Sequence, residues 1–141
     1  MLKHKYYVIK GGLKYKVPLW MLIFHDWDKF LPYMFTAFAT RRCEEKWNEK
    51  VHKAWGDHQR RSKHHFEYWI VINPYGFADN MFHYLDIPEV YIREMLADWY
   101  GAGYARTGRD EVIEWYEKYR KEIKLSGRTR DLLEKILYEG E

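Results

Sequence analysis

PLWMLIFHDWDKF, at residues 18–30, is the stretch from which the fold is predicted. Pro18 suits the first turn of a helix, and six apolar residues without a glycine follow it. Because apolar residues occupy nearly every side of such a helix, we expect it to lie buried inside a bundle. The stretch therefore predicts an all-α protein built around a central apolar helix.

Three polar residues share one side of this expected helix. At about 100° per residue, His25, Asp26 and Lys29 fall within one arc of roughly 100°. Burying such groups without partners is costly, so a ligand is expected beside them. A metal cation together with an anionic ligand would satisfy all three.

Composition indicates a single domain over residues 1–141. The chain is 47% hydrophobic and 19% aromatic, which is enough for one core. Its net charge of +3 suits an anionic substrate but lacks the basic excess of a nucleic-acid-binding protein. One cysteine excludes an internal disulfide, and no apolar run approaches about 18 residues. We therefore expect a cytoplasmic protein, in the host cytoplasm if a phage encodes it, that contacts no membrane.

The remaining segments are also predicted to be mostly helical, giving about six or seven helices. Residues 32–60 are typical of one long amphipathic helix, or of two joined by a kink, and residues 73–86 of a loop. Glycines at 11 and 12 are expected to bend or break the first helix, and small residues at 101–108 to end a later one. The other expected helices are residues 2–16, a short helix capped by Ser62, a helix capped by Asp86, residues 109–122 and a helix after Ser126.

Further candidate ligands lie outside the central stretch. His4 is near the start of the first helix, and His58, His64 and His65 fall within eight residues. On a helix beginning at Ser62, His65 would flank the buried face and His64 would point further away, so His65 is the preferred ligand and His64 the alternative. Asp98 lies on an apolar stripe, either as a ligand or as the partner of a buried Trp or Arg.

In chain order, the candidates resemble the HD superfamily of metal-dependent phosphohydrolases. That family uses a first histidine, an adjacent His-Asp pair and a distal aspartate in a helical domain, and its two-metal members add two histidines between the pair and the distal aspartate. The string FHDWDKF is similar to the family's hydrophobic-His-Asp-x-x-Lys turn. More narrowly, the chain looks like an uncharacterised HD-like family of phage and bacterial genomes. The residues that carry this likeness are His25-Asp26 with Lys29 and Phe30, His64-His65 with Tyr68-Trp69, and Asp98-Trp99 before a Gly-Ala-Gly turn.

The resemblance implies one or two divalent metal ions. Imidazole and carboxylate ligands suit Mn, Fe, Co, Ni or Zn, with Mg as a further candidate. Asp26 would bridge two ions, and a bound water of lowered pKa would be the nucleophile. The implied first site is His4, His25, Asp26 and Asp98, and the implied second site is Asp26, His58 and His65 or His64. Asp26, Lys29 and Asp98 are the implied catalytic residues, and Lys29, Arg60 and Arg106 the implied phosphate-binding residues.

Three functions are compatible with this pattern. The first is a phosphomonoesterase or phosphodiesterase that acts on a nucleotide or another small phosphoester. The second is an HD-type di-iron oxygenase, which uses the same His and Asp set. The third is a non-catalytic phage-type protein that binds a nucleotide or a host factor. The balanced charge argues against stable nucleic-acid binding.

Overall fold

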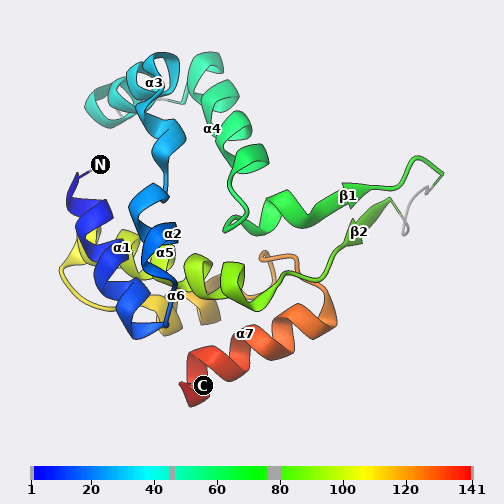
Figure 1. Cartoon of the computed structure of the whole chain (residues 1–141). Helices are drawn as coiled ribbons and strands as arrows, with labels where there is room; N and C mark the ends of the chain where they lie inside the picture. The colour runs from blue at the N-terminus through cyan, green and yellow to red at the C-terminus, as the bar shows by residue number, and fades with distance from the viewer. Residues whose placement is uncertain (1, 45–46, 76–80, 141) are drawn as a thin grey trace.

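The computed structural model describes residues 2–44, 47–75 and 81–140, which form helices and one small hairpin (Figure 1). The seven α-helices of this part of the chain confirm the predicted helical fold class. No helix in the described ranges is long and apolar enough to cross a bilayer. The elements are α1 (Leu2–Lys14), α2 (Leu19–Phe24), the 3-10 helix η1 (Trp27–Phe30), α3 (Pro32–Glu44), α4 (Glu49–Arg61), the 3-10 helix η2 (Phe66–Trp69), β1 (Ile70–Ile72), β2 (Phe82–Tyr84), α5 (Glu89–Thr107), α6 (Val112–Tyr119) and α7 (Gly127–Glu139).

Helices α1 and α5 pack against each other at unusually close range. A Cβ atom on Gly101 would lie 2.4 Å from Val8 Cγ2, and one on Gly11 would lie 2.9 Å from Tyr100 Cβ. The glycines therefore allow an approach that larger residues would prevent. This corrects two expectations: α1 continues through Gly11 and Gly12, and α5 runs past Gly101 to end before Gly108, whose φ is 80°. The close contact fixes the position of α1 along α5.

The core has two parts. Helices α3 and α4 enclose a small cluster of their own, and α4 begins after Asn48, whose side chain accepts a hydrogen bond from Val51 N at 3.0 Å. The junction expected between these helices includes residues 45–46, which lie outside the described ranges. The α3–α4 pair therefore stands beside the main core as a separate layer (Figure 1). Fully buried members of the main core include Val8, Leu22, Ile92, Leu96, Tyr116 and Leu133.

The stretch at residues 18–30 is not the buried helix that its composition predicts. Helix α2 ends at Phe24, and Trp20 and Phe24 are 63% and 62% exposed. His25 leaves the helical conformation, and Asp26 adopts a left-handed one with φ of 58°. This turn directs His25 and Asp26 inward. Several apolar side chains of α2 therefore remain exposed. A polar cluster, rather than apolar packing, therefore determines where this stretch lies.

Two predicted helix starts are also wrong. Ser62 ends α4, with its N–H donating to His58 O at 3.0 Å, and residues 62–65 form a turn. Asp86 does not cap α5, because its carboxylate instead accepts a hydrogen bond from Ser126 Oγ at 2.6 Å. Ser126 does cap α7, as predicted, by accepting from Thr129 N at 3.1 Å.

The hairpin was not expected from the sequence. Strand β2 lies in the segment predicted as a loop, and it pairs antiparallel with β1 in the register Ile70 to Tyr84. Residues 76–80 of that segment lie outside the described ranges. Each strand has only three residues, which is too short for a clear alternating pattern.

Replacing Gly101 with alanine should destabilise the protein, although alanine is the better helix former. The new methyl group would overlap Val8, and such overpacking lowers the free energy of unfolding by about 2 kcal/mol. The control is Gly127→Ala in α7, where a Cβ would meet nothing within 4 Å. Urea denaturation measures both. A Gly101→Ala variant as stable as the control would contradict the close helix packing.

Candidate metal centre

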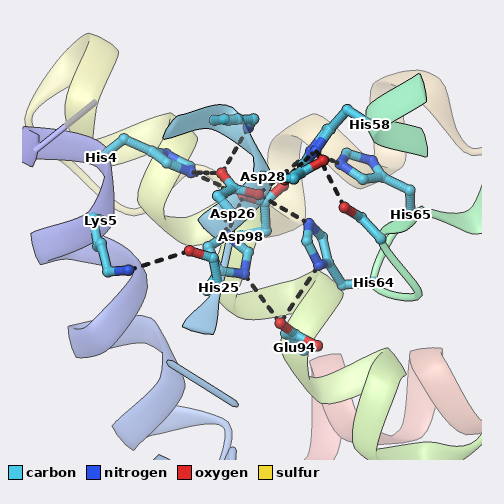
Figure 2. A network of polar contacts seen from close by, with 12 residues as sticks. His4, Lys5, His25, Asp26, Asp28, His58, His64, His65, Glu94 and Asp98 are labelled. Atoms are coloured by element: carbon cyan, nitrogen blue, oxygen red, sulfur yellow. Dashed lines mark hydrogen bonds and ion pairs between the residues drawn. The ribbon is translucent and has the colours of Figure 1, made fainter. Parts of the chain in front are cut away.

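Side chains from several segments between residues 4 and 98 meet in one polar cluster (Figure 2). His4 comes from α1, His25 and Asp26 from the turn after α2, and Asp98 from α5. The structure thus brings together all the histidines and aspartates proposed above as ligands. The other members of the cluster are Asp28 and Lys29 on η1, His58 in the last turn of α4, His64 and His65 in the turn that follows, and Glu94 on α5.

Asp26 is at the centre of this cluster. Its Oδ1 lies 3.3 Å from His58 Nε2 and 3.5 Å from His64 Nε2. Its Oδ2 lies 3.5 Å from His25 Nε2 and 3.6 Å from His4 Nε2. The left-handed backbone at Asp26 allows the carboxylate to face both pairs of rings, one with each oxygen.

The first group consists of His4, His25, Asp26 and Asp98, whose ligand atoms lie within 4.8 Å of one another. Asp98 Oδ1 is 2.9 Å from His4 Nε2 and 3.2 Å from His25 Nε2. In a tetrahedral site with bonds of about 2.0 to 2.2 Å, neighbouring ligand atoms are roughly 3.3 to 3.6 Å apart. The first group is therefore close to the spacing that a bound cation requires.

The second group consists of His58, His64 and His65, whose ligand atoms also lie within 4.8 Å of one another. His58 Nε2 and His65 Nε2 are 3.0 Å apart, so either a proton or a cation must lie between these two lone-pair-bearing atoms. The expectation that His64 points away is wrong, because His64 is buried beside Asp26. The expectation relied on a helix at residues 62–65, where the chain forms a turn.

Two carboxylates that the sequence did not predict, those of Glu94 and Asp28, contact the Nδ1 atoms of the histidines. Glu94 Oε1 lies 3.1 Å from His25 Nδ1 and 3.4 Å from His64 Nδ1, so it contacts one ring of each group (Figure 2). Asp28 Oδ2 lies 2.9 Å from His58 Nδ1. Ligating histidines in metal sites generally donate their other N–H to such a carboxylate. The available signal for Glu94 was its spacing of four residues from Asp98, which puts both on one face of a helix.

These partners fix which ring nitrogen is free to bind a ligand. Burial raises the pKa of Glu94, but hydrogen bonds from His25 and His64 outweigh it and hold the pKa below the usual range. An ionised Glu94 only accepts, so the Nδ1 atoms of both histidines carry the protons. Their Nε2 atoms then face Asp26 and Asp98 with either a second proton or a lone pair. A cation between Nε2 and these carboxylates satisfies both sides.

Three buried atoms in the cluster lack a hydrogen bond among the described residues: His4 Nε2, Asp26 Oδ1 and His64 Nε2. His4 Nε2 is near Asp98 Oδ1 but is not aligned with it as a hydrogen-bond donor. Buried polar atoms without partners are rare and costly, and here they face the centre of the cluster. This is the direct indication that the two groups together can hold a metal ion.

The charges of the cluster shift the pKa values of its histidines and of Asp26. Burial lowers the pKa of His4 and of His25, but the carboxylates around them outweigh this and raise both to about 9. Burial raises the pKa of Asp26, and the positive charges of His25 and Lys29 reverse the effect and hold it well below its usual value. Without a metal, the cluster is therefore stabilised by protons on its histidines.

A cavity of about 670 Å³ borders the first group, and we call it the basic cavity. His4, Asp26 and Lys29 lie on its wall, and Lys29 Nζ is 2.6 Å from Asp26 Oδ2. Arg106, proposed for phosphate binding, also lines it, while Arg60 does not: its side chain is 79% exposed, 3.5 Å from Asp57. The other lining residues include Lys5, Phe30, Phe38, Arg41, Arg42, Trp47 and Trp55.

Replacing Glu94 with glutamine should weaken metal binding at both groups, because Glu94 holds one histidine of each. Loss of such a partner lowers metal affinity by roughly 10- to 100-fold. Asp28→Asn should affect only the group that contains His58, and Glu89→Gln, an exposed position on α5, should have no effect. Titration of the metal-free variants with Mn or Zn measures this. Full affinity in Glu94→Gln would contradict the supporting role.

The pH dependence should have opposite signs without and with metal. A raised pKa means that His4 and His25 stabilise the metal-free fold fully below pH 6.5, and that this stabilisation is lost as the pH rises through about 9. Metal must displace these protons, so its binding strengthens over the same range. Melting temperatures with chelator should fall from pH 6.5 to 9, while the increase produced by added Mn should grow. An Mn effect independent of pH would contradict the cluster's protonation.

Comparison with known proteins gives a family but no activity. Neither the curated proteins nor the solved structures contain a match to this chain. A model described as a family of unknown function, DUF5662, matches residues 1–139, which is nearly the whole chain. The HD resemblance therefore rests on the ligand pattern alone. The chain belongs to the DUF5662 family.

Proposed function

We propose that the protein is a metal-dependent phosphohydrolase that acts on a nucleotide or another small phosphoester. The observation that carries the proposal is that five histidines and two aspartates form two adjoining ligand groups beside the basic cavity. The order of these ligands along the chain is also the basis of the resemblance to two-metal HD phosphohydrolases.

The donor set supports one or two divalent ions. It contains imidazole nitrogens and carboxylate oxygens, which suit Mn, Fe, Co, Ni or Zn, and no thiolate from the exposed Cys43. Asp26 presents one oxygen to each group, so His4, His25 and Asp98 would hold one ion with it, and His58, His64 and His65 a second. A bound divalent ion would lower the pKa of its water and so supply hydroxide near neutral pH.

The basic cavity supports a phosphorylated substrate. Five cationic side chains line it, and one of them, Lys29, also contacts Asp26. Burial lowers the pKa of Lys29, but Asp26 outweighs this and raises it, so the ammonium group stays charged. Lys29 can thus hold Asp26 in place and offer its remaining N–H donors to a phosphoryl oxygen. The other four cations are Lys5, Arg41, Arg42 and Arg106.

The direct test combines metal content with activity. Protein purified without chelator should carry one or two transition-metal ions per chain, and Asp26→Ala should lose nearly all of them, because both groups depend on this carboxylate. With added Mn, the wild type should release phosphate or open a phosphodiester in a panel of nucleoside mono-, di- and triphosphates and cyclic dinucleotides. Asp26→Ala should be slower by roughly 100-fold or more.

Controls separate the other functions. Lys53→Ala, an exposed lysine on α4 that pairs with Asp57, should keep full metal content and activity. Equal metal in the wild type and Asp26→Ala would contradict the site. Iron-dependent oxygen uptake without phosphate release would instead support a di-iron oxygenase. Tight nucleotide binding with no turnover under any metal would support a non-catalytic binding protein.

A further inference from the structure

A second cavity, of about 350 Å³, borders the metal-ligand cluster at His64, His65 and Asp98. We call it the acidic cavity, because its wall contains carboxylates and neither lysine nor arginine among the described residues. Its size is at the lower end of the range for small-molecule pockets, about 300 to 1,000 Å³. Its distinctive lining residues are Trp55, Phe66, Trp99, Trp115, Glu67 and Glu122.

The two cavities have opposite character and meet at the same cluster. Trp55 lines both of them, and the ligand groups supply wall residues to each. A phosphate is attracted by the cations of the basic cavity and repelled by the carboxylates of the acidic one. A molecule that occupies both must therefore carry its phosphate at one end and an uncharged or hydrogen-donating group at the other.

The Glu67 carboxylate lines the acidic cavity, and one of its two oxygens lacks a hydrogen bond. Its Oε2 atom is buried and accepts no hydrogen bond among the described residues, and His65 Nδ1 lies 3.9 Å from it, beyond hydrogen-bond distance. A buried acceptor of this kind is satisfied by a ligand that brings an N–H group to it.

We propose that the acidic cavity binds the base of the substrate nucleotide and selects bases that carry an exocyclic amino group. The inference rests on the proposed function and names the part of the substrate that the basic cavity does not hold. Indole and phenyl side chains offer surfaces on which a base can stack. Glu67 accepts hydrogen bonds from the amino edge, best from guanine, which presents two adjacent donors. Uracil places carbonyl oxygens beside the carboxylate and is disfavoured.

Binding of uncleavable analogues tests this without turnover. Isothermal titration of the Mn-loaded full chain would compare the 5′-phosphonate analogues of GMP and UMP, in which CH2 replaces the bridging oxygen. The GMP analogue should bind roughly tenfold or more tightly than the UMP analogue. Glu67→Gln should reduce this ratio toward one, while ribose 5-phosphate binds as to the wild type. Glu114→Gln, an exposed position on α6 outside the cavity, should keep the ratio.

A second variant keeps the test decisive if Glu67→Gln does not fold. Trp115→Leu should weaken both analogues by roughly tenfold through lost stacking and leave ribose 5-phosphate unchanged. Equal affinity for the two analogues, or an unaltered ratio in Glu67→Gln, would overturn the base-binding role. Absence of phosphate release from any substrate, with the base preference intact, would overturn only the proposed hydrolysis.

Discussion

The structure depends on one buried carboxylate, that of Asp26, which lies among histidine rings from four segments of the chain. A buried charge must be paired, and histidine nitrogens lie within 3.6 Å of both of its oxygens. His4 reaches it because glycines let α1 approach α5, which also carries Asp98 and Glu94. The ligand set therefore depends on the packing of α1 against α5. A change that separates these helices also moves His4 away from Asp98.

The polar cluster explains why the chain leaves so much apolar surface outside. The turn at His25 and Asp26 ends α2 after six residues and leaves Trp20, Phe24 and Trp27 more than half exposed. Apolar packing alone would favour burial of these side chains. The observed turn instead places the His25 imidazole within reach of Asp98 and Glu94. The segment therefore buries less apolar surface but completes the ligand set.

The sequence predicted the helical class, the adjoining His-Asp pair and the distant members of the set, because residue types and their order carry that information. It did not predict Glu94 and Asp28, whose roles depend on the direction of side chains in the fold. The direction of His64 was predicted wrongly because it lies in a turn, where helical periodicity does not hold. The sequence also indicated a helix end at Gly101, since a glycine that permits close helix packing and one that ends a helix look alike in a single sequence.

We propose above that Asp26 is shared by two cation sites, one on each side of its carboxylate. Anomalous diffraction from crystals grown with Mn measures this most directly. Two peaks are expected, one within bonding distance of Asp26 Oδ2, His4, His25 and Asp98, and one within bonding distance of Asp26 Oδ1, His58, His64 and His65. Full occupancy by Mn elsewhere in the molecule, with no peak at Asp26, would contradict it.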